Sequence, residues 1–348
     1  MKIFLKKSVL STLLTISLGS TAYAQDAWEI ITSGTTAELR GLSVVSKNVV
    51  WASGTKGTIL KTTDGNNWKN MSILEASNLD FRDIQGIDKN TAIAMSAGPG
   101  KASTIYKTTD GGEHWQLLKV NQAEAGFWDA IAFWDEKNGV LFGDPINGQF
   151  EVLITADGGL TWKEAASDTS QLSALANEGA FAASGTCVAV QGHSEIWLAT
   201  GGASASRIFH SSDKGKTWTV AQTQIPANAP PKGAFSVAFS DAKHGFAVGG
   251  DYQKPKGEDL NAVVSQDGGK TWQASAALPS GFLSVVAKIP HKKNSFVVGG
   301  LAGSGITHDG GKTWKVLGET PLNALEFADL NHGWAVGPKG LLMKYVGK

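Results

Sequence analysis

The sequence predicts an all-β fold, a seven-bladed β-propeller whose last blade is closed by a short N-terminal strand. Three observations lead to this prediction: a turn motif present six times, a spacing between its copies that suits one blade, and 42 glycines among 348 residues. Glycine is therefore well above the usual ~7%, without a collagen-like period. Such a surplus favours many tight turns between short strands.

The repeated motif is a polar turn that ends in tryptophan. Residues 108–115 read Thr-Thr-Asp-Gly-Gly-Glu-His-Trp, and this pattern returns at 155–162, 211–218, 265–272 and 307–314. A sixth copy, at 62–68, is one residue shorter. Successive tryptophans are 47, 47, 56, 54 and 42 residues apart, which suits four-stranded propeller blades. The motif residues are Asp64, Asp110, Asp157, Asp213, Asp267, Asp309, Trp68, Trp115, Trp162, Trp218, Trp272 and Trp314.

Each residue type in the motif has a mechanical role. The aspartate can accept backbone N–H bonds within its own turn, and the glycine two positions later tolerates a positive φ. In the short copy Asn66 stands at the glycine position, and we expect it to adopt that conformation. The Ser/Thr hydroxyl can bond within the same hairpin, and tryptophan opens the next strand with a large buried area. The motif resembles the Asp-box, or BNR, repeat of sialidases and other propellers, which implies a fold and not an activity.

The other strands of each blade can be predicted from the residues around its Asp-box. In the second repeat the pattern predicts strands at 82–87, 91–97, 104–108 and 115–119. The other inner strands are expected to begin near Arg40, Asp129, Thr186, Ser236, Ser284 and Asn323. These are seven inner strands for six boxes, and the last unit, 322–346, ends after three strands. We therefore predict that residues 27–32 supply the missing outer strand, which removes exposed sheet edges.

The N-terminus is typical of a secretory signal. Lys2, Lys6 and Lys7 precede a short apolar run, and Ala22-Tyr23-Ala24 offers a small-residue cleavage site. The apolar run is too short to cross a bilayer comfortably. We expect a signal peptide at 1–24 and a single propeller domain at 25–348. The exported chain would be periplasmic or secreted, monomeric and not membrane-spanning.

Composition excludes several function classes. Basic and acidic residues both number 31. Loss of the signal removes three lysines and no acids, which leaves a formal charge of −3, so we expect no nucleic-acid partner. The single cysteine, Cys187, lies in an apolar stretch and cannot form an internal disulfide or a multi-cysteine zinc site. No glycine-rich dinucleotide fingerprint follows a strand, and we expect no cofactor.

The predicted register divides the loops between two faces. The Asp-boxes and the turns between first and second strands share one face, the box face. All seven histidines fall there, so neither a histidine base nor a metal site is expected. They are His114, His193, His210, His244, His291, His308 and His332.

The opposite face, at the mouth of the central channel, collects the unusual side chains. Arginine, carboxylates and aromatic residues around a channel mouth are typical of a ligand or partner site. The candidate binding residues are Arg40, Arg82, Asp83, Trp128, Asp129, Asp144, Glu178, Phe181, Asp251, Tyr252 and Asn323. The alternative is structural: Asp129 and Asp144 would hold turns, and Arg40 and Arg82 would pair with them.

The mature chain as a whole resembles the photosystem II stability/assembly factor family, in its exported bacterial members. The resemblance rests on segments 50–57, 81–84, 132–135, 139–145 and 182–187. It implies a seven-bladed propeller that binds protein partners during assembly of a membrane complex, without catalysis. Photosynthetic members carry an arginine-rich surface patch, whereas this chain has three arginines, Arg40, Arg82 and Arg207. We therefore expect a different partner.

Two function classes follow. The first is an exported, non-catalytic propeller that docks a protein or a glycan at the channel mouth, as a binding or assembly scaffold. The second is a glycoside hydrolase or lyase that uses carboxylates on the same face, for example Asp129 and Glu178. Three arginines do not support the substrate-binding triad of a sialidase. We assign no catalytic residue.

Overall fold

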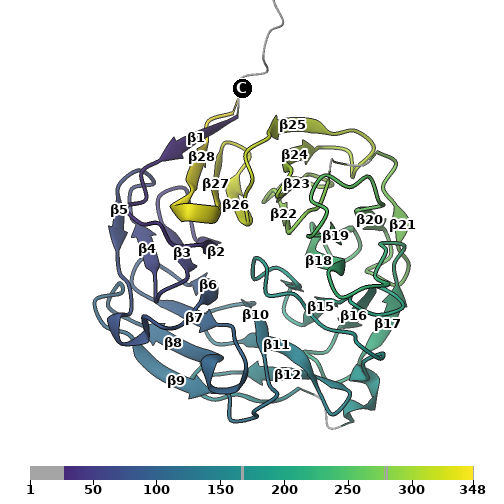
Figure 1. Ribbon diagram of the computed structural model, residues 1–348, viewed down its shortest axis with the longest axis horizontal. Coiled ribbons are helices and arrows are strands. Elements are labelled where there is room, and N and C mark those ends of the chain that lie inside the picture. Colours follow the sequence, from purple (N-terminus) through teal and green to yellow (C-terminus); the bar gives the residue numbers. More distant parts are fainter. Residues whose placement is uncertain (1–26, 166–167, 278, 280, 348) are drawn as a thin grey trace, which may run out of the picture.

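The structure, a computed structural model, describes residues 27–165, 168–277, 279 and 281–347. The predicted signal peptide, 1–24, lies outside the described residues. Within them, 28 strands form seven four-stranded antiparallel sheets, which stand in a ring around a central channel (Figure 1). The prediction of an all-β, seven-bladed propeller is confirmed.

In each blade the strands run outward from the channel in chain order, except that the outer strand of blade 7 comes from the N-terminal end of the described chain. Blade 1 consists of β2 (Leu39–Val44), β3 (Val50–Gly54), β4 (Ile59–Thr62) and β5 (Trp68–Asn70). Blade 2 consists of β6 (Phe81–Gly86), β7 (Ala92–Ser96), β8 (Thr104–Thr108) and β9 (Gln116–Val120). Blade 3 consists of β10 (Trp128–Phe133), β11 (Gly139–Ile146), β12 (Gln149–Thr155) and β13 (Lys163–Glu164). Blade 4 consists of β14 (Val188–Gln191), β15 (Glu195–Ala199), β16 (Arg207–Ser211) and β17 (Thr219–Gln222).

The remaining blades follow the same order. Blade 5 consists of β18 (Lys232–Phe239), β19 (Gly245–Asp251), β20 (Ala262–Ser265) and β21 (Gln273–Ala274). Blade 6 consists of β22 (Val285–Lys288), β23 (Phe296–Gly300), β24 (Gly303–Thr307) and β25 (Lys315–Gly318). Blade 7 consists of β26 (Ala324–Asp329), β27 (His332–Val336), β28 (Leu342–Tyr345) and β1 (Trp28–Ile31). Four 3₁₀ turns lie in the loops: η1 (Leu74–Ala76), η2 (Gly100–Ala102), η3 (Thr169–Leu172) and η4 (Pro338–Gly340).

The two ends of the described chain close the ring. Strand β1 pairs antiparallel with β28, with Trp28 opposite Tyr345, so the purple and yellow strands lie side by side (Figure 1). The Ala27 N–H also donates to the Leu317 carbonyl of blade 6, at 2.8 Å. The prediction that the N-terminal segment completes the seventh blade is confirmed.

The Asp-boxes bond internally as the sequence predicts. In the third copy Asp157 Oδ1 accepts from the Thr161 N–H at 2.9 Å, and Thr155 Oγ1 accepts from the Gly159 N–H at 2.9 Å. Gly159 has a φ of +84°. The expectation for the short copy is wrong: Asn66 does not adopt a positive φ, and Gly65 does, at +75°. With one residue fewer, the turn has a single left-handed position, at Gly65. The Asn66 N–H still donates to Asp64 Oδ1.

The core lies between neighbouring blades. Trp51, Trp197 and Trp334 occupy matching positions in the second strands of blades 1, 4 and 7, and all three are fully buried. Two of the ring nitrogens donate to the adjacent blade: Trp51 Nε1 to the Asp88 carbonyl at 3.0 Å, and Trp197 Nε1 to the Gly268 carbonyl at 2.8 Å. Cys187 is also buried. Large rings therefore bind one blade to the next through both packing and hydrogen bonds.

Histidines at the box face serve their own turns. The Nδ1 atoms of His244 and His332 lie 2.8 Å from the carboxylates of Asp241 and Asp329, each three residues earlier. Within the described ranges no group of three or more His, Cys, Asp or Glu residues is placed to hold a metal ion. None of the helical segments in that part of the chain is long and apolar enough to cross a membrane.

Candidate functional site

The channel mouth opposite the Asp-boxes holds a cavity of about 500 Å³ to which all seven blades contribute. We call it the mouth cavity. This volume is in the range of ligand-binding pockets, ~300–1,000 Å³. Its lining comprises Glu38, Arg40, Arg82, Phe127, Asp129, Asp144, Ala180, Phe181, Ala182, Ala183, Phe235, Tyr252, Phe282, Ser284, Leu301 and Asn323.

The floor of the mouth cavity is a loop that crosses the channel. Residues 179–186, which precede β14, form this central segment, the teal loop near the middle of the ring in Figure 1. Its Ser184 Oγ donates to the Ser284 carbonyl of blade 6 at 2.8 Å. Gly185 has a φ of +72°, and a Cβ there would lie 2.3 Å from Asp83 Oδ1 of blade 2. The segment therefore requires glycine where it comes closest to Asp83. It separates the mouth cavity from the channel below.

One wall of the mouth cavity carries the two arginines. Arg82 Nε forms an ion pair with Asp80 Oδ2 at 2.7 Å, and Arg40 NH2 lies 3.9 Å from Glu38 Oε1. Both guanidinium groups also donate to the central segment, at the carbonyls of residues 182 and 183. Burial, and then the charge of Arg82, lower the pKa of Arg40. The arginines are thus held by acids of their own loops, and not by Asp129 and Asp144 as the structural alternative assumed.

The opposite wall is aromatic. The rings of Phe181 and Phe235 stack with centroids 3.7 Å apart, and Phe282 meets Phe235 edge to face at 4.8 Å. Tyr252 packs against both Phe235 and Phe282 and remains 45% exposed. Phe235 and Phe282 are buried. They pack against Phe181 and Tyr252 and support these two rings at the cavity.

Two carboxyl groups, Asp129 and Asp144, lie between these walls. Asp129 is only 1% exposed and its Oδ2 has no hydrogen-bond partner among the described residues. Burial, and then the neighbouring Asp144, raise the pKa of Asp129 well above its usual range. Burial also raises the pKa of Asp144, whose Oδ1 accepts from the Ala180 N–H at 2.8 Å. The protonated form of each carboxyl group is therefore favoured by its burial.

Seven of the eleven predicted binding residues line the mouth cavity: Arg40, Arg82, Asp129, Asp144, Phe181, Tyr252 and Asn323. The other four lie elsewhere. Asp83 lines the channel below the central segment. Trp128 is buried and donates from Nε1 to Glu151 Oε2 at 3.0 Å. Asp251 holds its own turn by accepting from the Gln253 N–H at 2.9 Å.

Glu178 is the fourth residue outside the mouth cavity. Its side chain is fully buried and forms an ion pair with Arg207. The Thr200 hydroxyl donates to Glu178 Oε1 at 2.6 Å, and the Leu175 N–H donates to Oε2 at 2.8 Å. Both carboxylate oxygens are therefore engaged within blade 4 and its preceding loop.

Sequence reasoning missed several lining residues, among them Phe235 and Phe282. Both looked like ordinary core positions in an apolar stretch. A comparison of the repeats offers a signal, because phenylalanine recurs near the start of the inner strand in blades 2, 3, 5 and 6. These residues are Phe81, Phe127, Phe235 and Phe282.

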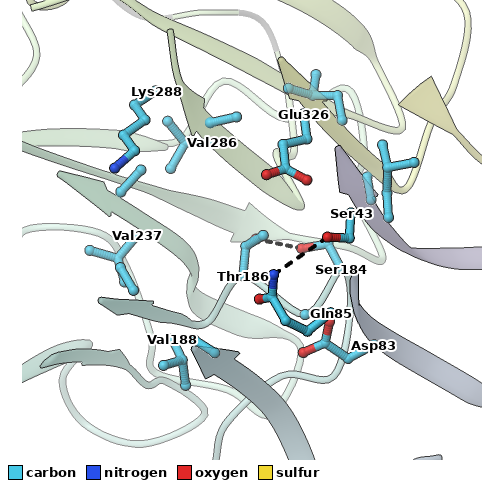
Figure 2. A pocket seen from close by; sticks show the side chains of 18 of the residues that line it. Ser43, Asp83, Gln85, Ser184, Thr186, Val188, Val237, Val286, Lys288 and Glu326 are labelled. Atoms are coloured by element: carbon cyan, nitrogen blue, oxygen red, sulfur yellow. Dashed lines mark hydrogen bonds between the residues drawn. The ribbon is translucent and has the colours of Figure 1, made fainter. Parts of the chain in front are cut away.

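Below the central segment, the inner strands enclose a second cavity of about 220 Å³, the channel cavity (Figure 2). Figure 2 shows Ser43, Gln85 and Glu326 on one side and Val188 and Val237 on the other. Glu326 Oε2 accepts from the Val44 N–H of blade 1 at 2.7 Å and so joins the last blade to the first. Ser43, Asp83 and Ser236 accept N–H groups of the following blade in the same way.

Glu326 is expected to make the free energy of unfolding depend on pH. Burial raises its pKa to about 7, opposed by the Val44 N–H and by Lys288. The folded chain then holds a proton that the unfolded chain releases near the ordinary glutamate value of 4.5. We expect the free energy of unfolding to fall as pH rises from about 4.5 to about 7, and Glu326→Gln to flatten this dependence. Urea denaturation across that range measures it.

The matched control for this measurement is Glu319→Gln, because Glu319 is exposed. It should retain the wild-type pH dependence. Asp83, whose pKa burial raises well above its usual range, contributes in the same direction as Glu326. A Glu326→Gln variant with an unchanged slope would show that this carboxyl does not titrate in the range.

Comparison with known proteins establishes the fold. Residues 263–274 match the family model described as BNR/Asp-box repeat, and no curated protein matches the chain by sequence. The solved structure of YCF48 bound to D1 peptide superposes with a TM-score of 0.66 at 18% identity, over 94% of this chain and 99% of that one. YCF48 from Cyanidioschyzon merolae gives 0.66 at 16% identity, over 92% and 98% of the two chains.

A propeller of lower sequence identity to this chain shows the same architecture. The WD40 β-propeller domain of Doa1 superposes with a TM-score of 0.60 at 11% identity, over 92% of this chain and 96% of that domain. At these identities the similarity shows the fold alone. The BNR match and the YCF48 structures confirm the resemblance to photosystem II assembly factors at that level.

Proposed function

We propose that the chain is an exported, non-catalytic propeller that binds an extended segment of a protein partner in the mouth cavity, as a binding or assembly scaffold. The observation that carries the proposal is the cavity itself, in which charged, polar and aromatic side chains from all seven blades converge. Buried aromatic residues with a polar rim are typical of protein-binding hot spots. The chain acts as a monomer in the periplasm or outside the cell.

Two further observations support this function. A propeller of the same fold, YCF48, has been solved with a D1 peptide bound. The residues of the mouth cavity are also held rigidly, because the central segment is bonded to blades 1, 2 and 6. A rigid site loses less conformational entropy when it binds a flexible segment. The partner differs from that of the photosynthetic proteins, since only two arginines line the cavity.

The competing hypothesis is glycoside hydrolysis. The predicted pair Asp129 and Glu178 does not meet in one cavity, because Glu178 is paired with Arg207. Asp129 and Asp144 do line one cavity, and the raised pKa of Asp129 suits a general acid. Cleavage of any member of a glycan panel by the wild-type chain, lost in Asp129→Asn with the fold intact, would overturn the binding proposal.

The test of peptide binding uses Tyr252. A random-peptide array probed with labelled wild-type protein should yield binding sequences, and Tyr252→Ala should weaken binding of the best peptide by about 30-fold. The reason is that the Tyr252 ring forms the accessible part of the aromatic wall. Titration of that peptide by fluorescence anisotropy measures the change.

The matched control is Leu160→Ala. Leu160 is a similarly exposed apolar side chain, 55% exposed, in the Asp-box that begins at Thr155. It lies on the box face, so its loss should leave peptide affinity unchanged. Equal weakening by both variants, or an array without any binding sequence, would contradict the proposed function.

A further inference from the structure

Two of the three carboxyl groups that line the mouth cavity, those of Asp129 and Asp144, form no ion pair with a basic residue among the described residues. Among the described residues, every ion pair involves other acids: Glu38, Asp80, Asp110, Glu178, Glu195, Asp259, Asp241 and Asp329. Asp144 Oδ1 is bonded to the Ala180 N–H, and Asp129 Oδ2 is buried and unpartnered. A buried acid of this kind is costly unless a cation or a proton neutralises it.

Neither arginine of the same cavity forms an ion pair with Asp129 or Asp144, although the charge of Arg82 opposes the rise in the pKa of Asp129. Arg82 directs its Nε to Asp80, and Arg40 lies beside Glu38. Each arginine on this wall therefore has one acid of its own. Over the lining, the three acids Glu38, Asp129 and Asp144 outnumber the two arginines by one, so the fully ionised cavity carries one negative charge in excess.

The aromatic wall adds a second feature that favours a cation. Phe181 lies on the central segment, and the neighbouring Ala180 N–H donates to Asp144 Oδ1 at 2.8 Å, so an aromatic ring and one acid of the pair are held by one short loop. Aromatic faces attract ammonium and guanidinium groups within about 6 Å, most strongly where water is excluded. Carboxylates beside aromatic rings in one cavity are thus complementary to an organic cation.

We propose that the mouth cavity takes the side-chain cation of a lysine or arginine of the bound partner segment, with Asp129 and Asp144 as its counter-ions and Phe181 and Tyr252 as its aromatic contacts. This inference rests on the proposed function and names the chemistry of the partner. The ammonium or guanidinium group enters between the two walls and pairs with the acids. The arginine wall then meets polar or acidic groups that flank the basic residue.

The experiment is the random-peptide array, probed with wild-type protein and with Asp144→Asn. Wild-type protein should select peptides enriched in lysine or arginine. Replacement of the selected basic residue by norleucine should weaken binding by about 10-fold or more, and replacement by glutamate further. Asp144→Asn should lose the preference for basic residues and bind the basic and norleucine peptides with affinities within about 3-fold of each other.

Controls separate a local effect from a general one. Asp259→Asn makes the same change at an exposed acid outside the cavity lining, and this variant should select the same basic peptides as wild type. Asp129→Asn tests the buried member of the pair, and its thermal melt shows whether the fold is intact. Rescue of the preference by Asp144→Glu would support a role of charge at this position.

The outcomes distinguish the two proposals. If no peptide binds, the proposed function fails. If peptides bind but are enriched in aspartate or glutamate, the inference is overturned and the proposed function stands. The same conclusion follows if norleucine replaces the basic residue without loss of affinity, or if Asp144→Asn retains the preference.

Discussion

Replacement of Glu178 by alanine is expected to lower the free energy of unfolding by about 3–5 kcal/mol, the cost of breaking a buried ion pair by removing one partner. The change would leave the Arg207 guanidinium, 90% buried beside it, without its carboxylate. It would also leave the Thr200 hydroxyl and the Leu175 N–H without an acceptor. Urea denaturation followed by far-ultraviolet circular dichroism measures the loss.

The design includes a control and a double variant. Glu319→Ala, at an exposed position, should change the free energy of unfolding by less than about 0.5 kcal/mol. The double variant Glu178→Leu with Arg207→Met should recover part of the loss, because an apolar pair can replace a buried ion pair with little cost. A loss below about 1 kcal/mol in Glu178→Ala would show that Arg207 finds another partner or water.

This result also affects how any loss of activity is interpreted. Both Asp129 and Glu178 looked like carboxylates at the channel mouth, because Asp129 begins a predicted inner strand and Glu178 lies in a long loop of the same predicted face. In the structure Glu178 bonds to residues of blade 4 and its preceding loop. A loss of binding or hydrolysis in Glu178→Ala would therefore follow from unfolding. Asp129→Asn and Asp144→Asn are the informative substitutions.

The fold could be predicted because its signal is local and repeated. Each Asp-box carries its own hydrogen bonds within eight residues, as between Thr155, Asp157 and Thr161. The count of inner strands against boxes then showed one outer strand missing, which β1 supplies. What failed was local geometry: with one residue fewer, the turn keeps a left-handed position at Gly65 and loses the second one, which was expected at Asn66.

The site could be predicted only where it follows the repeat. Arg40, Arg82, Asp129 and Asn323 mark starts of inner strands, and all four line the mouth cavity. The central segment follows no periodicity, since its place across the channel depends on contacts to residues 40, 82 and 284 far along the chain. The same holds for the pairing of Glu178 with Arg207, 29 residues apart. Sequence alone offered no reason to remove Glu178 from the candidates.

The second large loss of stability is expected at Trp28, a residue that takes part in closing the ring. Its indole meets Phe327 and Tyr345 edge to face, with centroids 5.9 and 5.5 Å apart, and its Nε1 donates to Ser304 Oγ of blade 6 at 2.9 Å. The side chain is buried and joins the first strand of the described chain to blades 6 and 7. Trp28→Ala is expected to lower the free energy of unfolding by about 3–5 kcal/mol, the usual cost of truncating a core aromatic residue.

The matched control lies two residues along the same strand. Ile30 is 69% exposed, and Ile30→Ala should keep the free energy of unfolding within about 0.5 kcal/mol of wild type. Because strand β1 pairs with β28 through backbone bonds in both variants, the difference between them isolates the buried indole. Urea denaturation monitored by circular dichroism avoids the loss of a fluorophore in Trp28→Ala. Equal stability of the two variants would mean that the backbone ladder alone closes the propeller, and that the indole contacts with blades 6 and 7 add nothing to it.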